Sequence, residues 1–186
     1  MKKMLALGVL LLGCVPVAGF GLTDDTGWDN SPNAHIHGMQ AEVLGVYFTP
    51  PAGAAAAIVH AIDASEHAVL VQAYGFTHNA IAQALVRAHQ RGVTVRVLLD
   101  KKSRAANRYV IDALVQDHIE VRQDGKHAIA HNKVMVIDES VVITGSFNFT
   151  NSAETRNAEN FIILKSSELA QKYQAQWRTH WAHGVE

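Results

Sequence analysis

The sequence predicts an α/β fold in which helices flank a mixed β-sheet. Strand and helix patterns alternate through residues 41–116, and strands dominate from there to residue 164. The composition fits such a fold, because 48% of the 186 residues are hydrophobic and 18% are charged. A chain of this length and composition can bury one core, so we expect one domain.

The first half of the domain is expected to alternate between strands and helices. Ile58 and Ile62 lie one turn apart in the first helix, and Ile81 and Leu85 do so in the second, which Gly92 ends. Runs of β-branched and apolar residues between the helices are typical of strands. The expected strands are 41–48, 67–74 and 93–99, and the expected helices are 54–65, 78–91 and 104–116.

The second half is expected to be mostly strand, followed by one helix. Polar residues 138–140 separate two apolar runs, which predicts a tight turn and a hairpin. Ser166 or Ser167 is expected to cap the last helix. Large apolar residues at four-residue steps predict a buried stripe on this helix, for the core or for a dimer contact. The stripe is Leu169, Tyr173, Trp177 and Trp181, and the expected strands are 119–122, 132–137, 141–144 and 160–164.

Residues 1–21 have the layout of a bacterial secretory signal peptide. Lys2 and Lys3 precede an uncharged apolar run that Pro16 interrupts, and small residues follow. Cleavage is favoured over an uncleaved anchor, because the continuous apolar stretch is short for a membrane span. The Leu-Leu-Gly sequence before Cys14 also resembles a lipoprotein cleavage box, so a lipid on Cys14 is an alternative.

A polar segment, residues 22–40, is expected to link the signal peptide to a domain at 41–186. We therefore expect an exported, periplasmic protein, soluble or lipid-anchored. His35 and His37 have a spacing that a metal ion could use, but no third ligand is near them, so an ordinary linker is the preferred interpretation. Cys14 is the only cysteine, so no disulfide is expected in a chain cleaved beyond it.

The most informative stretch is His131-x-Lys133-x4-Asp138-x6-Gly145-Ser146-x-Asn148. Residues two apart in a strand share a face, so His131 and Lys133 should converge, as should Ser146 and Asn148. A phosphodiester is negatively charged and weakly electrophilic, so its cleavage needs a positioned nucleophile and stabilisation of charge. Imidazole, ammonium and amide groups that meet at one point supply both.

This spacing resembles the HxKxxxxD signature of the phospholipase D superfamily. The segments AYGFT at 73–77, RGVTVRV at 91–97 and NAEN at 157–160 extend the resemblance over residues 43–181, to the small periplasmic endonucleases that carry one motif. It implies a phospholipase D-like sheet with one half-site per chain. It also implies catalytic roles for His131, Lys133, Ser146, Asn148 and Glu159, the last of which would orient His131.

Other residues near the motif are expected to support the site. Asp138 lies at the predicted turn, where it should hold backbone through hydrogen bonds rather than contact substrate. Gly145 should permit close approach of backbone or substrate. Four aromatic residues are expected in the core, although the last two could instead line the cleft: Phe147, Phe149, Tyr74 and Phe76.

A covalent mechanism requires a nucleophile on one side of phosphorus and a general acid on the other, and one histidine cannot serve both. No second HxKxxxxD motif occurs in the sequence. We therefore expect a two-fold homodimer in which His131 faces its own copy. The pair should titrate as a coupled unit and give a bell-shaped pH dependence. We expect no metal ion and no cofactor, because the cations are built into the motif.

The leading hypothesis is a homodimeric endonuclease that hydrolyses DNA with little sequence preference. RNA is an additional candidate substrate. Net charge gives little support, since loss of Lys2 and Lys3 would change it from −1 to −3. The alternatives are a phospholipase D acting on phospholipid headgroups and a nucleic-acid-binding protein with a silent site. Two basic groups could form a rim or only a solvated face: Lys101, Lys102, Arg104 and Arg108, and Arg122, Lys126 and His127.

Overall fold

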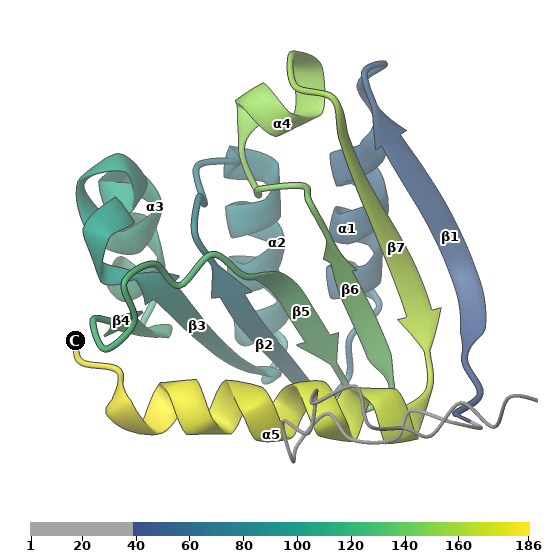
Figure 1. Ribbon diagram of the computed structural model, residues 1–186. Coiled ribbons are helices and arrows are strands. Elements are labelled where there is room, and N and C mark those ends of the chain that lie inside the picture. Colours follow the sequence, from purple (N-terminus) through teal and green to yellow (C-terminus); the bar gives the residue numbers. More distant parts are fainter. Residues whose placement is uncertain (1–38) are drawn as a thin grey trace, which may run out of the picture. The chain divides into compact units, whose positions relative to one another are not determined.

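The computed structural model describes residues 39–186, which form a seven-stranded mixed sheet with helices on both faces (Figure 1). This confirms the predicted fold class. The strand order is β1-β7-β6-β5-β2-β3-β4. The strands are β1 (Glu42–Thr49), β2 (Ala68–Ala73), β3 (Thr94–Asp100), β4 (Glu120–Asp124), β5 (Lys133–Ile137), β6 (Val141–Gly145) and β7 (Glu159–Lys165). The helices are α1 (Ala54–Asp63), α2 (Asn79–Gln90), η1 (Lys101–Ser103), α3 (Arg104–Gln116), α4 (Asn151–Thr155) and α5 (Ser167–His183).

The sheet has a parallel part and an antiparallel part. β2, β3 and β4 are parallel, because α2 and α3 return the chain to the same end between them. β5, β6, β7 and β1 are antiparallel to their neighbours. The predicted turn joins β5 to β6: Asp138 and Glu139 have φ of 49° and 52°, and the N–H of Ser140 donates to the carbonyl of Ile137 at 3.1 Å.

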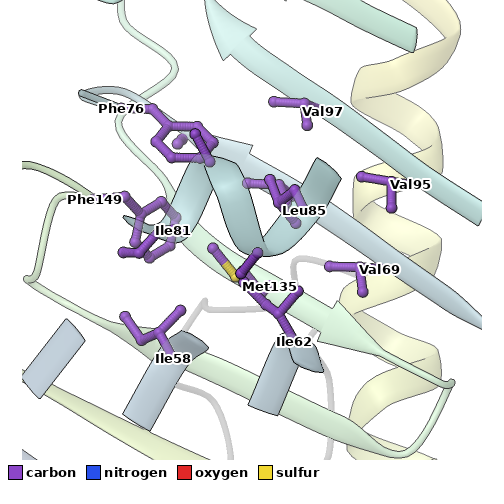
Figure 2. Packing of buried hydrophobic residues seen from close by; sticks show 14 of the residues in the cluster. Ile58, Ile62, Val69, Phe76, Ile81, Leu85, Val95, Val97, Met135 and Phe149 are labelled. Carbon is purple, nitrogen blue, oxygen red and sulfur yellow. The ribbon is translucent and has the colours of Figure 1, made fainter. Parts of the chain in front are cut away.

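Helices α1, α2 and α3 cover one face of the sheet and enclose the larger part of the core. Ile58 and Ile62 of α1 and Ile81 and Leu85 of α2 are fully buried, which confirms the helical spacing predicted for both pairs. Figure 2 shows them around Met135 of β5, which is also fully buried. On this face, apolar side chains of α1, α2 and α3 pack against the central strands of the sheet.

Helix α5 crosses the opposite face of the sheet (Figure 1). Trp177 is buried there, and its Nε1–H donates to the carbonyl of Val71 at 2.9 Å. Trp181 stacks on Trp177 with ring centroids 4.6 Å apart. The apolar stripe of the last helix therefore belongs to the core. Ser166 provides the cap, since its hydroxyl accepts the N–H of Leu169 at 3.4 Å.

Element boundaries agree with the sequence prediction to within two residues, but two short elements were not predicted. η1 and α4 have only three and five residues, too few to create a periodic apolar pattern. The hydroxyl of Thr150 caps α4 by accepting the N–H of Ala153 at 3.1 Å. Both elements lie close to the site described below.

Several expectations concern residues outside the described range. The expected signal peptide, the box at Cys14 and most of the linker, with His35 and His37, all precede residue 39. Within residues 39–186, none of the helices combines the length and the apolar character that crossing a bilayer requires.

Candidate active site

The residues of the motif gather at one end of the sheet. β2 ends there and β5 begins, since Ala73 pairs with Lys133. β6 also ends there and β7 begins, since Gly145 pairs with Phe161. Antiparallel pairing thus places residues from four strand ends at a common edge. They are Tyr74 after β2, His131 and Lys133 at β5, Ser146 after β6, and Glu159 at the start of β7.

The imidazole of His131 is exposed and lies beside an aromatic ring. Its ring centroid is 4.8 Å from that of Tyr74, with 57° between the planes. The Nζ of Lys133 lies 5.6 Å from the same Tyr74 ring and donates to the backbone carbonyl of His131 at 2.7 Å. Tyr74 therefore lines the site, and the expectation that it lies in the core is wrong. Phe76, two residues on, is fully buried as predicted.

Lys133 brings a positive charge into a largely buried position. Only 7% of its surface is exposed. Burial lowers the pKa of the Lys133 ammonium, and the nearby carboxylate of Glu159 partly offsets this by raising it. Because little water surrounds the ammonium, its field on a phosphoryl group at the sheet end is weakly screened.

Glu159 is held by polar neighbours. The Ser146 hydroxyl donates to one carboxylate oxygen at 2.6 Å, and the Asn157 amide donates to the other at 3.0 Å. The Ser146 hydroxyl in turn accepts the N–H of Asn160 at 3.1 Å. Within residues 39–186, Glu159 makes no hydrogen bond to His131 in this state, and its electrostatic partner is Lys133.

The side chain of Asn148 lies close to the backbone of Gly75, which follows the end of β2. A Cβ placed on Gly75 would lie 3.4 Å from the Asn148 Oδ1. That oxygen is buried and has no hydrogen-bond partner in the described part of the chain. An unpaired buried amide atom is costly and rare in native proteins.

Ser146 lies at the edge of the site, because it follows Gly145 and because side chains after Gly145 alternate between the two sides of the chain. A Cβ on Gly145 would lie 2.6 Å from the Cα of Phe161, so close strand approach requires glycine. Phe147 and Phe149 are buried in the core, as the alternation predicts. Ser146 lies on the other, exposed side.

Asp138 acts at the opposite end of β5 from the motif histidine. Its carboxylate accepts the backbone N–H groups of Glu66, His67 and Ala68 at 2.8 to 2.9 Å. Burial alone would raise the pKa of Asp138, but these three hydrogen bonds outweigh it and lower the pKa. Asp138 thus anchors the start of β2 to the hairpin and lies away from the sheet end where substrate would bind.

Replacing Asp138 by asparagine should destabilise the fold by about 1–3 kcal/mol at pH 7, because three N–H groups lose a charged acceptor. A depressed carboxyl pKa adds stability above the unfolded-state value, and this stability is lost as pH falls through the folded-state value. The difference should therefore shrink below about pH 4. Urea unfolding at pH 7 and pH 3 measures it. Asp112→Asn, at an exposed ion pair with Arg108, is the control and should change little.

Two buried polar residues that the sequence did not single out hold Tyr74 in place. The Asn107 amide donates to the Tyr74 carbonyl at 2.8 Å and accepts the N–H of Phe76 at 2.8 Å. The Ser103 hydroxyl also donates to the Tyr74 carbonyl, at 2.7 Å. The sequence indicated that Asn107 could hold Tyr74 only in that it is a polar residue within the amphipathic helix at 104–116.

Comparison with known proteins decides the family. The family model described as "Cardiolipin synthase, PLD-like domain" matches residues 58–181, which is most of the described domain. The chain belongs to the phospholipase D superfamily. Members of this superfamily are phosphodiesterases, and this chain is one of these enzymes.

Relatives within the phospholipase D superfamily carry different names. A Rickettsia conorii protein named phospholipase D is 46% identical over 143 residues, covering 77% of this chain and 72% of that protein. The mitochondrial cardiolipin hydrolase of Mus musculus is 31% identical over 124 residues, covering 67% of this chain and 56% of that protein. This chain therefore spans little more than half of the cardiolipin hydrolase.

Two solved structures share the fold. Nuc from Salmonella typhimurium, a phospholipase D family member, superposes with a TM-score of 0.75 at 33% identity, covering 78% of this chain and 97% of that chain. NucT from Helicobacter pylori gives a TM-score of 0.71 at 23% identity, covering 78% of this chain and 99% of that one. The likeness to Nuc extends over nearly the whole of that protein.

Proposed function

We propose that the protein is a metal-independent endonuclease that hydrolyses DNA with little sequence preference, and that RNA is a further substrate. The observation that carries this proposal is that the exposed imidazole of His131 and the ammonium of the buried Lys133 both lie beside the ring of Tyr74. An accessible nucleophile beside a weakly screened cation suits attack on a phosphodiester. The sequence resemblance to small single-motif endonucleases favours a nucleic acid as the substrate.

Basic side chains beside the site support a polyanionic substrate. Lys101 and Lys102 are exposed on η1, which Ser103 ties to the carbonyl of Tyr74. Arg104 follows at the start of α3, and none of these three cations forms an ion pair within residues 39–186. Arg122 does not belong to this rim, because Glu120 and the ring of Trp181 occupy its guanidinium. The three free cations would contact the phosphate backbone.

The proposed mechanism has two steps. A ring nitrogen of neutral His131 attacks phosphorus and the P–O bond to the leaving group breaks, while the partner subunit's His131 donates its proton to the departing oxygen. Water then attacks the phosphohistidine, the partner subunit's His131 takes a proton from it, and His131 leaves as a free imidazole. Lys133 and Asn148 stabilise the phosphoryl oxygens, and Ser146 and Glu159 brace the site. One histidine must be neutral and the other protonated, so the rate should peak between two macroscopic pKa values.

A heterodimer of one unchanged chain and one His131→Ala chain tests the shared site. If both histidines serve one phosphate, this heterodimer should lose at least about 10³-fold in rate, although it keeps one intact motif. Two different affinity tags isolate it after co-expression, and cleavage of a fluorescent oligonucleotide reports the rate. A heterodimer with half the activity of the unchanged dimer would mean that each chain works alone, and would contradict the proposed dimeric site.

Side-by-side assays decide the substrate class. Purified full-length protein should cleave plasmid DNA with EDTA present in the assay, at an initial rate close to that without EDTA. Phosphatidylcholine vesicles test the second candidate, a phospholipase D, which the names of the Rickettsia relatives favour. Headgroup release without DNA cleavage would replace the nuclease proposal. DNA retention without cleavage would indicate a silent binding protein, and a rate that requires added Mg²⁺ would exclude the metal-independent mechanism.

We further propose that residues 1–21 direct export to the periplasm and are then removed, with a lipid on Cys14 as the alternative. The apolar run that follows Lys2 and Lys3 supports this. Mass spectrometry of the mature protein distinguishes the two forms, because a lipoprotein would begin at a diacylated Cys14. A mature chain that keeps Met1 would exclude both.

A further inference from the structure

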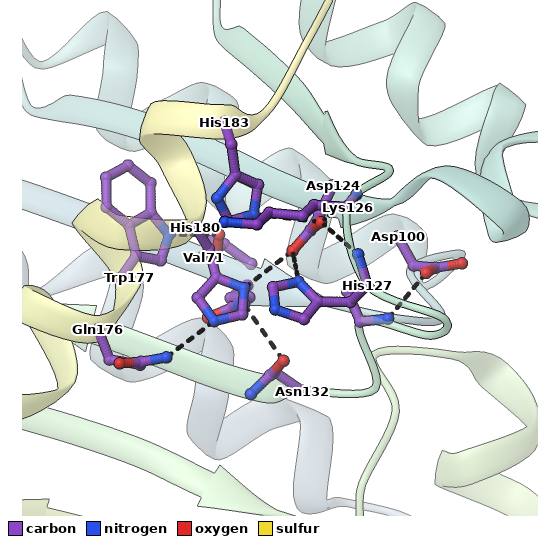
Figure 3. Close-up of polar contacts among 12 residues, drawn as sticks. Val71, Asp100, Asp124, Lys126, His127, Asn132, Gln176, Trp177, His180 and His183 are labelled. Carbon is purple, nitrogen blue, oxygen red and sulfur yellow. Dashed lines mark hydrogen bonds and ion pairs between the residues drawn. The ribbon is translucent and has the colours of Figure 1, made fainter. Parts of the chain in front are cut away.

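A second cluster of titratable side chains lies where β4 meets the C-terminal end of α5 (Figure 3). Asp124 is the last residue of β4, and His127 follows it in the loop of residues 125–132. His180 and His183 lie one turn apart at the end of α5. One potential ligand atom from each of these four residues lies within 4.8 Å of the other three.

The carboxylate of Asp124 is buried at the centre of this cluster. Its Oδ2 lies 2.8 Å from the Nδ1 of both His127 and His180, and its Oδ1 lies 3.3 Å from the Nε2 of His183. Figure 3 shows the three rings around it. The ring centroids are 4.5 Å apart for His127 and His180, and 5.3 and 5.4 Å from each of these to His183.

Hydrogen bonding alone leaves this cluster incomplete. Three imidazoles share one carboxylate, and the buried Nε2 of His183, although 3.3 Å from Oδ1 of Asp124, has no well-aligned hydrogen bond within residues 39–186. Buried polar atoms of native proteins are almost always paired. A cation at the centre would accept a lone pair from each imidazole and a bond from the carboxylate, so that all four ligand atoms would have a partner.

We propose that Asp124, His127, His180 and His183 bind one zinc ion. Three imidazole nitrogens and one carboxylate oxygen are ligands that zinc accepts in a tetrahedral site. Ligands of such a site lie roughly 3.3 Å apart, so modest side-chain rotations would close the cluster around an ion. The side chain of His127 is 43% exposed and the Asp124 side chain is fully buried, so the ion would enter past His127.

The surroundings of His180 suit a metal ligand. Its Nε2 lies 2.9 Å from the side-chain amide of Gln176, one turn earlier on α5. A rotated amide presents oxygen in place of nitrogen, and would then accept the Nε2–H of His180. Such a contact would fix the tautomer in which Nδ1 carries the lone pair for zinc.

The ion would join α5 to the loop that leads to the active site. Residues 125–132 begin next to Asp124 and contain His131, and the N–H of Ala130 donates to the carboxylate of Asp100 at 2.9 Å. Zinc would fix the other end of this loop through His127. His131 and Lys133 are not ligands, so the ion would stabilise the fold and take no part in the chemistry.

Cobalt titration of the untagged, full-length, metal-free protein tests the site, because tetrahedral Co²⁺ has intense visible bands and zinc displaces it. We expect one equivalent per chain, with affinity for zinc in the micromolar range or tighter. His180→Gln combined with His183→Gln should weaken binding at least about 100-fold. His127→Gln, whose side chain is 43% exposed, should also weaken it, and circular dichroism checks that this variant keeps its fold. Zinc should raise the unfolding temperature of the unchanged chain by several degrees, and that of the double variant should not move.

Matched controls separate this site from other histidines. His60→Gln on the exposed side of α1, His131→Gln in the motif, and the pair His35→Gln and His37→Gln should all bind cobalt as the unchanged chain does. Absence of the visible bands in the unchanged protein would overturn the proposal, as would equal affinity of the double variant. Binding lost in the His35 and His37 pair would place the metal elsewhere and overturn it too. The readout is metal binding, so the result does not depend on nuclease activity.

Discussion

Replacing His131 by alanine should reduce turnover of an oligonucleotide by a factor of at least about 10⁴. The proposed mechanism assigns the bond to phosphorus to the imidazole of His131, so its removal leaves Lys133 without the nucleophile that it assists. The fold should not change, because the residue is exposed and its ring, within residues 39–186, has an aromatic contact with Tyr74 only. Single-turnover cleavage of a labelled oligonucleotide measures the rate, and circular dichroism checks the fold.

The control for this variant is His60→Ala, at an exposed position on α1, which should keep full activity. Acid-labile phosphate bound to protein should be trapped from the unchanged enzyme during turnover and be missing from the His131 variant. If the variant cleaves at more than a few per cent of the normal rate, or still forms the adduct, His131 is not the nucleophile.

Replacing Lys133 by methionine should have opposite effects on activity and stability. Loss of the ammonium should lower the rate by about 10²- to 10³-fold, because it removes the charge beside the phosphoryl group. Burial lowers the pKa of Lys133, so at neutral pH the folded state bears the cost of a buried charge. Methionine fills similar space without that cost. Loss of the hydrogen bond to the His131 carbonyl partly offsets this gain, so we expect at most about 1 kcal/mol of added stability, or roughly 3 °C in unfolding temperature.

The matched control is Lys165→Met, an exposed lysine at the far end of β7, which should leave both the rate and the unfolding temperature nearly unchanged. Calorimetry and single-turnover kinetics on the same samples give the two quantities. A Lys133→Met protein that is less stable but still active would show that the lysine serves the fold rather than the reaction.

Sequence periodicity predicted the regular elements because burial enforces it. Ile58, Ile62, Ile81 and Leu85 recur at helical steps, and each is fully buried against the sheet. The same reasoning could not find η1 or α4. Their few residues are fixed by local hydrogen bonds, such as that from the N–H of Ser103 to the carboxylate of Asp100.

The candidate site was only partly predictable from spacing. His131 and Lys133 lie at the same end of the sheet as Ser146, because strand pairing places the start of β5 and the end of β6 there. The partners of Asp138 could not be predicted, since they lie about seventy positions earlier, at and just before the start of the neighbouring strand. The position of Tyr74 depends on Asn107, which reaches it from another helix.

By itself, the sequence determined the alternating elements, the family and the spacing of the motif, because these depend on local periodicity and residue identity. Only the tertiary structure decided which distant residues meet. Asp124 and His127 are more than fifty positions from His180 and His183, and no local pattern links them. They form one cluster because Trp177 and its neighbours hold α5 across the sheet, with its last turn beside the end of β4. Apolar burial thus brings together polar groups whose combined chemistry cannot be read from either segment alone.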